Sequence, residues 1–450
     1  MPLIIDMIDL NYKKLTLNEG YKIMQKIIFG LIILSCSLMQ AELYNDQLPG
    51  VLNSNLRPFT PEEQQEIAQA EEIMRNTELD KKYTNTKFLA QYDKVRQELI
   101  KDFGFTQELI TTDDGTKIDA LVLSQPEAKK TVILSAGFYA GRIEGNAHIM
   151  NALAQRDDVN IIFIHTRRHG PKGRICFGPK NNGLLSHSNI RNMGDEEWID
   201  HIGAYNYAIE KFENTKLLCI GICAGSYHMT RAHTKLQEQV KAKNILPRFT
   251  DTKAQQAQKI LDSIEGYWFD SAWTNVHDTT RNALRHEVPN VITKMFLPKS
   301  LPKTVSKTAN FFIGHSLLWW HSCCIAKHQK QLPDTKDEMA NINKPVVIAQ
   351  SQQDLVTPLT PLFDIANKRF AANLSTFIIQ PDYHQAFTNR TKIGHTQFGI
   401  KQFQRYKPLL YNFIENPADM KTNLIPKPTQ PEQPTQPDKS LSGISTLEKW

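Results

Sequence analysis

One segment constrains the fold of this chain more than any other: residues 216–226, which read Lys-Leu-Leu-Cys-Ile-Gly-Ile-Cys-Ala-Gly-Ser. Its apolar first half is typical of a buried strand, and helix-forming residues follow from 227 to 235. A strand-to-helix turn this tight strains the backbone of its central residue and accepts only small residues around it. Gly221, Ala224 and Gly225 meet that need. The sequence therefore predicts that Cys223 stands above the edge of a sheet, at a helix N-terminus that favours the thiolate.

Apolar runs of strand length recur along the chain and alternate with helical patterns. They cover residues 131–135, 159–164, 216–222, 264–269, 345–350 and 375–380, and a hairpin is predicted at 109–123 around Asp114-Gly115. Continuous apolar strands between helices favour an α/β fold, with a mostly parallel sheet and helices on both faces. Residues just past the carboxyl ends of such strands are candidates for a site, because open α/β sheets bind ligands there.

The sequence predicts four parts. Residues 1–41 form a signal peptide or N-terminal extension, and 42–104 an N-terminal helical segment. Residues 105–416 form the sheet domain, and the proline-rich stretch 417–450 is an extended tail. The apolar run 27–34 follows Lys26 and precedes the small residue Ala41, which indicates export to the periplasm, the exterior or a membrane anchor. Membrane association through this apolar segment is a second expectation, and a buried N-terminal helix is the alternative.

Composition excludes several classes of partner. The hydrophobic content of 40% and the charged content of 22% are ordinary for a globular protein. The net charge of +6 is spread along the chain, so nucleic-acid binding is not expected. The six cysteines lack the spacing of a disulfide framework or a zinc site, and the sequence predicts no metal and no cofactor.

Two stretches interrupt the alternation of strands and helices. Residues 237–259 read as a charged insertion, and residues 273–341 as a longer one with prolines and helical patches. The second lies between two predicted strands, where a helical lid would cover the site. Its aromatic residues, including Trp319 and Trp320, are candidates for an apolar acyl pocket or for the core of the lid itself.

This arrangement resembles the α/β-hydrolase superfamily over residues 105–416, with the lid stretch unmatched. The resemblance implies a nucleophile, an acid and a histidine in that chain order, here Cys223, Asp354 and His384. Asp354 follows the predicted strand 345–350, and His384 follows the strand 375–380. Asp270, after the strand 264–269, is the rival acid, and His395 is the rival histidine. A cysteine in this turn is similar to dienelactone hydrolases and polyhydroxyalkanoate synthases of the superfamily.

The same resemblance implies the other site residues. The oxyanion hole would use the backbone N–H groups of Ala224 and Phe138. The candidate substrate pocket comprises Tyr139, His169, Trp319 and Trp320. The loop 165–170, His-Thr-Arg-Arg-His-Gly, resembles the loop that orders the edge of such sites, and it is either a recognition element for an anionic substrate or a solvated basic loop.

The resemblance implies a hydrolase that acts on a carboxylic ester or thioester through a Cys-His-Asp triad and an acyl-enzyme intermediate. The expected substrate is a small or lipid-like acyl compound. Two alternatives stay open: an acyltransferase or polyester synthase on the same fold, and a non-catalytic binding protein that keeps the fold.

Overall fold

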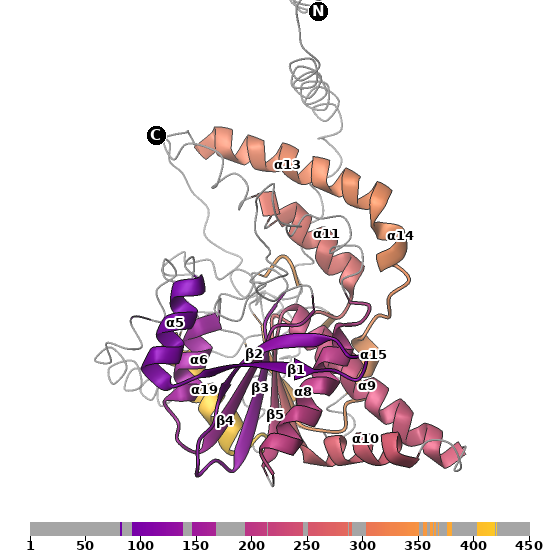
Figure 1. The fold of residues 1–450 in the computed structure, drawn as a ribbon. Coiled ribbons are helices and arrows are strands. Elements are labelled where there is room, and N and C mark those ends of the chain that lie inside the picture. The colour runs from indigo at the N-terminus through magenta and orange to yellow at the C-terminus, as the bar shows by residue number, and fades with distance from the viewer. Residues whose placement is uncertain are drawn as a thin grey trace, which may run out of the picture.

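The computed structural model describes residues 82, 92–137, 146–167, 194–213, 215–245, 251–286, 288–289, 303–350, 354–357, 361–362, 364–365, 368, 376–379, 403–418 and 420. Within these residues the strands form one eight-stranded sheet in the order β1-β2-β4-β3-β5-β6-β7-β8 (Figure 1). The strands are β1 (Thr106–Thr111), β2 (Lys117–Leu123), β3 (Lys130–Ser135), β4 (Val159–Ile164), β5 (Lys216–Ile222), β6 (Ile264–Asp270), β7 (Val346–Ala349) and β8 (Thr376–Ile379). Every predicted strand is present with bounds that agree to within one residue, except that β1 begins three residues before the predicted hairpin.

The sheet is mostly parallel, as predicted. Strands β1, β2 and β4 pair antiparallel, and the pairs from β4 through β3, β5, β6 and β7 to β8 are parallel. The hairpin between β1 and β2 turns at Gly115, whose φ of 79° favours glycine. In the register, Gly221 pairs with Ser135, and Ile222 pairs with Asp270. The carboxyl ends of β3, β5 and β6 therefore meet at one edge, on either side of Cys223.

Helices cover both faces of the sheet (Figure 1). One face packs against α5 (Tyr92–Phe103), α6 (Ala147–Ala154) and α19 (Phe403–Glu415), and the other against α8 (Glu197–Lys211), α9 (Ala224–Ile245) and α10 (Asp251–Ser263). Along β3, Val132 and Leu134 belong to the first apolar cluster and Ile133 to the second. The strands read as unbroken apolar runs because both of their faces are buried.

The prediction that residues 237–259 form an insertion is wrong, because their helical parts belong to the regular layer of helices. It supplies the end of α9 and most of α10. Ala254, Ala257 and Ile260 of α10 are buried, and their spacing of three residues places them on one helix face. Glu238, Lys241, Lys253 and Lys259, which suggested an insertion, are exposed.

Residues 273–341 contain α11 (Val276–His286), α13 (Lys303–Cys324), α14 (Ala326–Gln329) and α15 (Lys336–Ala340). The stretch begins in the core, since Trp273 is 1% exposed and packs with Val276 and Ile325. Figure 1 shows α11 beyond the sheet and α13 beyond α11. The helical content is confirmed, and a lid function for this region stays a prediction.

The predicted signal peptide and most of the segment 42–104 lie outside the described residues, so export stays a prediction. The predicted tail 417–450 also lies outside them except for residues 417, 418 and 420, and Met420 is buried in the core, so an extended tail from residue 417 is wrong at its start. None of the helices that the structure describes combines the length and apolar character needed to cross a membrane.

Candidate active site

The turn at Cys223 has the predicted strained geometry. Cys223 has a φ of 56°, a left-handed backbone conformation that side chains other than glycine seldom adopt. Strand β5 ends at Ile222, and α9 begins at Ala224, so one residue separates strand from helix. A Cβ atom on Gly221 would lie 2.7 Å from the backbone nitrogen of Ser226, and one on Gly225 would lie 2.6 Å from the carbonyl oxygen of Ser135. Both glycines are therefore required by close backbone approaches.

Gly137 brings the chain after β3 directly against the cysteine. A Cβ atom there would lie 2.4 Å from the Cβ and 3.1 Å from the Sγ of Cys223. A side chain at residue 137 would displace the thiol, so glycine leaves the room that the Cys223 side chain occupies. The thiol itself is 0% exposed.

A chain of hydrogen bonds fixes the turn to the next strand. The backbone N–H of Cys223 donates to the carbonyl oxygen of Asp270 at 2.7 Å. The hydroxyl of Ser226 donates to the carbonyl oxygen of Cys223 at 2.6 Å and accepts from the backbone N–H of Trp273 at 2.9 Å. Sequence reasoning missed Ser226, although its position directly after the glycine pattern was a usable signal.

Asp354 lies in a short turn after β7 and is 3% exposed. Its Oδ1 accepts the backbone N–H groups of Val356 and Thr357 at 2.9 and 3.0 Å. Its Oδ2 accepts the Thr357 hydroxyl at 2.6 Å and the Gln350 amide at 3.0 Å. These four donors fix the orientation of the carboxylate, which is what the acid of a triad requires.

Asp270, the rival acid, follows β6, the strand beside β5, and is 2% exposed. The Ser271 hydroxyl donates to its carboxylate at 3.1 Å, and Ser271 has a φ of 52°. Burial raises the pKa of Tyr406 in α19, and the neighbouring charge and hydrogen bond of Asp270 raise it further. Cys223 after β5 and Ser271 after β6 are thus both strained residues other than glycine. The sequence did not reveal the strain at Ser271.

Several predicted site residues lie outside the described residues: Phe138, Tyr139, His169, His384 and the rival His395. Ala224 is buried at the first position of α9. The two tryptophans differ in burial: Trp320 is partly buried against the core, whereas Trp319 is 71% exposed. The prediction that Trp319 lies in an apolar pocket or a lid core is therefore wrong, because four successive apolar residues on a helix cannot all face inward.

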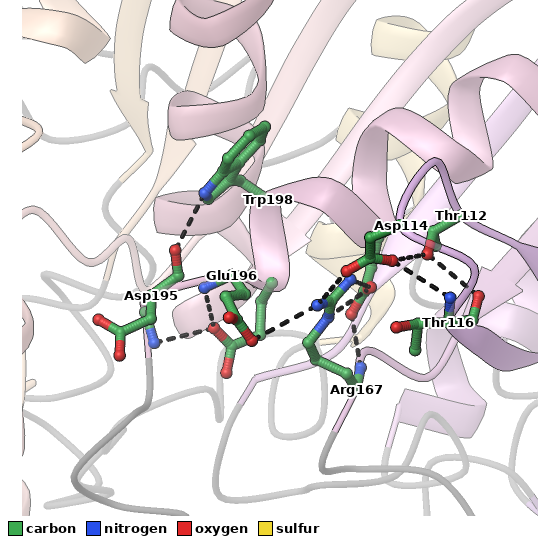
Figure 2. Close-up of polar contacts among 10 residues, drawn as sticks. Thr112, Asp114, Thr116, Arg167, Asp195, Glu196 and Trp198 are labelled. Carbon is green, nitrogen blue, oxygen red and sulfur yellow. Dashed lines mark hydrogen bonds and ion pairs between the residues drawn. The ribbon is translucent and has the colours of Figure 1, made fainter.

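Of the predicted loop 165–170 the structure describes residues 165–167, and in this part Arg167 is neither a solvated cation nor free for an anionic substrate. Figure 2 shows Arg167 among acidic residues. Its guanidinium binds Asp200 of α8 at 2.8 Å and Asp114 of the hairpin at 2.8 Å, and its backbone N–H donates to Asp200 at 2.5 Å. The carboxylate of Glu196 lies 3.5 Å away. These contacts tie the exit of β4 to α8 and to the β1–β2 turn.

The pKa values in this cluster reflect burial and pairing. Burial opposes the charge of Arg167, but hydrogen bonds to Asp200 and Asp114 outweigh it and raise the Arg167 pKa. The hydrogen bond from Arg167 holds the pKa of Asp114 well below its usual range. Burial raises the pKa of Asp200 to about 6, although Arg167 favours its charged form. Arg167 therefore has a structural role, because its carboxylate partners neutralise its positive charge.

A second buried network holds His165, the first residue after β4. Its Nδ1 lies 2.9 Å from Asp119 of β2, and Asp119 also accepts from Arg96 of α5 at 2.8 Å and from Gln107 at 2.8 Å. Burial disfavours the Asp119 charge, but His165 and Arg96 outweigh it and lower the Asp119 pKa. His165 and Arg167 thus both anchor the start of the loop after β4.

Within the part of the chain that the structure describes, no group of three His, Cys, Asp or Glu side chains could hold a metal ion. Cys219, Cys223, Cys323 and Cys324 are in the reduced form, and the last two are exposed. Burial raises the pKa of Cys219 to about 12, so this neighbour in β5 is inert at neutral pH.

The strand order and the strained turn at Cys223 define an α/β-hydrolase fold. No protein-family model and no curated protein matches the chain. Among solved structures, an esterase from Pyrococcus furiosus matches with 15% identity over 70% of this chain and 93% of its own, with a TM-score of 0.45. An esterase from Thermogutta terrifontis matches with 14% identity over 70% and 99%, with a TM-score of 0.38.

A longer protein, an acylaminoacyl peptidase from Pyrococcus horikoshii, matches with 10% identity over 69% of this chain and 41% of its own, with a TM-score of 0.41. The strand order and the turn geometry of this chain define its fold independently of these similar structures.

Proposed function

We propose that this protein hydrolyses a carboxylic ester or thioester with Cys223 as the nucleophile. The observation that carries the proposal is the φ of 56° at Cys223, at a turn whose two flanking glycines have no room for a Cβ atom. Such strain persists only where the surroundings enforce it, and it is typical of functional positions. The turn also places the Cys223 side chain at the N-terminus of α9.

In the proposed reaction His384 takes the proton of the Cys223 thiol, the sulfur attacks the acyl carbon, and a bond from Sγ to that carbon forms. The carbon–oxygen or carbon–sulfur bond to the leaving group then breaks, and the leaving group takes a proton from His384. Water, deprotonated by His384, attacks the resulting acyl-thioester and releases the carboxylic acid and the thiol. Asp354 holds the imidazole in the required orientation.

Asp354 is the preferred acid because four donors fix its carboxylate and it follows β7 as the triad order requires. The carboxylate of Asp270 already accepts a hydrogen bond from the Ser271 hydroxyl, and the carbonyl oxygen of Asp270 accepts one from the backbone N–H of Cys223. Its place beside the turn suits support of the nucleophile more than orientation of a histidine from beyond β8. The N–H of Ala224, the first residue of α9, is the proposed oxyanion donor, together with that of Phe138.

The test compares Cys223→Ala with Cys219→Ala, its matched control from the same strand. Short p-nitrophenyl esters and acyl-thioesters are the substrates. We expect Cys223→Ala to lose at least about 10³-fold in kcat/KM with an unchanged melting temperature, and Cys219→Ala to keep turnover. Equal turnover by Cys223→Ala and the wild-type protein would refute the proposal.

One observation favours a second candidate, a binding protein that keeps the fold: the Cys223 side chain is fully buried. Iodoacetamide labelling, mapped by peptide, separates the two. Cys323 and Cys324 are exposed and serve as internal positive controls, while buried Cys219 is the negative control. Labelling of Cys223 supports the enzyme, and its protection under native conditions together with absent turnover supports the binding protein.

A further inference from the structure

Helix α13 lies at the periphery and carries no charge over most of its length. It spans Lys303–Cys324, and the sequence carries no Asp, Glu, Lys or Arg between Lys307 and Lys327. Leu317, Leu318, Trp319 and Trp320 are consecutive, so their side chains point in directions about 100° apart. Between Lys307 and Lys327 the exposed residues of α13 are uncharged: Thr308, Trp319, Ser322, Cys323 and Cys324.

Apolar side chains of α13 reach the surface of the protein. Trp319 is 71% exposed, and Phe311, Phe312, Ile313, Leu317 and Leu318 are partly exposed. Among the described elements, α13 makes its main contacts with α11 and α14. Figure 1 shows α11 between α13 and the sheet, with the far side of α13 turned away from both. Val305, 45% exposed, the partly exposed Phe312 and Trp319 are seven residues apart, so they lie on one stripe of the helix, and this stripe is a candidate interaction surface.

The charges around α13 identify the kind of partner. Lys303 and Lys307 lie in its first turns, and Lys327 and Lys330 follow its end. The neighbouring α11 adds exposed Arg281 and Arg285 against one exposed acid, Asp278. An apolar helix with cationic ends, a basic neighbour and tryptophan at its surface fits an anionic lipid interface, where basic residues meet headgroups and indole rings lie at their level.

We propose that α13 docks in the plane of an anionic lipid bilayer, with Trp319 inserted at the headgroup level. A second copy of this chain is a poorer occupant, because a symmetric contact through α13 would bring the two sets of lysines and arginines together. This inference is independent of the proposed function, since neither Cys223 nor the two candidate acids takes part in it.

The test measures binding of the full chain to vesicles of phosphatidylcholine alone and with phosphatidylglycerol, by co-sedimentation and tryptophan fluorescence. The variant is Trp319→Glu, and the control is Leu109→Glu on β1, where the leucine is 63% exposed. We expect Trp319→Glu to bind at least about tenfold more weakly and Leu109→Glu to bind as wild type. The combined variant Lys303→Glu, Lys307→Glu should lose the preference for phosphatidylglycerol.

Three outcomes would overturn the proposal. The first is no vesicle binding by the wild-type chain. The second is equal binding by Trp319→Glu, which would assign binding to another segment such as the apolar run 27–34. The third is a wild-type dimer in sedimentation that Trp319→Glu dissociates, which would assign α13 to contacts between copies. Because Trp319 is exposed, an unchanged circular dichroism spectrum is expected and checks that the variant folds.

Discussion

Gly137 and Cys223 approach so closely that a Cβ atom on the glycine would lie 2.4 Å from the Cβ of the cysteine. The residues are 86 positions apart in the chain and meet because β3 and β5 are neighbours in parallel register. The space for the thiol is therefore set by the chain after β3 as much as by the turn that holds Cys223.

Gly137→Ala should reduce esterase turnover by at least about tenfold and the free energy of unfolding by about 1–3 kcal/mol, because the methyl group must displace Cys223 or its own backbone. Turnover of an ester and urea denaturation measure the two effects. Gly314→Ala in α13 is the control, since its Cβ atom would come no nearer than 3.3 Å to another atom. Wild-type turnover in Gly137→Ala would show that this contact does not position the nucleophile.

On the proposed triad, Asp354→Asn should reduce kcat by about 10²–10⁴ with little change in KM, because an amide would not stabilise a charged imidazole at His384. Asp270→Asn should cost less, since its backbone carbonyl, which binds Cys223, is unaffected. Steady-state kinetics of the two variants decide between the acids. A larger loss from Asp270→Asn would transfer the role of the acid to Asp270.

Arg167→Ala should lower the free energy of unfolding by about 3 kcal/mol, because it leaves the fully buried Asp200 without its ion-pair partner. The double variant with Asp200→Asn should cost less than the sum of the two single variants, with a coupling of about 1–3 kcal/mol. Urea denaturation measures the cycle. Lys94→Ala, which breaks an exposed pair with Glu98, should cost about 0.5 kcal/mol or less. Additive effects at Arg167 and Asp200 would contradict a buried pair.

Stability should fall on acidification below pH 6.5, in part because of His201. Burial lowers the pKa of His201 in α8 to about 3. The unfolded chain, in contrast, binds a proton there near the ordinary value of 6.5. The unfolded state thus binds more protons between these values, and His201 should cost about 2 kcal/mol at pH 5 relative to pH 7. Urea denaturation of His201→Gln at both pH values should show a smaller difference than wild type.

Sequence patterns predicted the sheet well because their signals are local. The strand 159–164 has the predicted bounds, and the glycines around Cys223 marked the turn, since each reflects a steric limit that nearby residues impose. The patterns failed where distant contacts decide. The charges of 237–259 suggested an insertion, although the buried face of α10 makes it part of a helical layer. The charge of Arg167 suggested a free cation, although Asp200 and Asp114 neutralise it.

The sequence by itself determined that β5 must end in a strained turn at Cys223, because only the small residues at 221, 224 and 225 permit that bend. It also determined the layered architecture, because strands with two apolar faces need helices on both sides. Tertiary structure alone decided which side chains surround the turn. Ser226, Gly137 and Asp270 meet there because parallel register brings together strand ends that lie far apart in the chain, and no local pattern records that register.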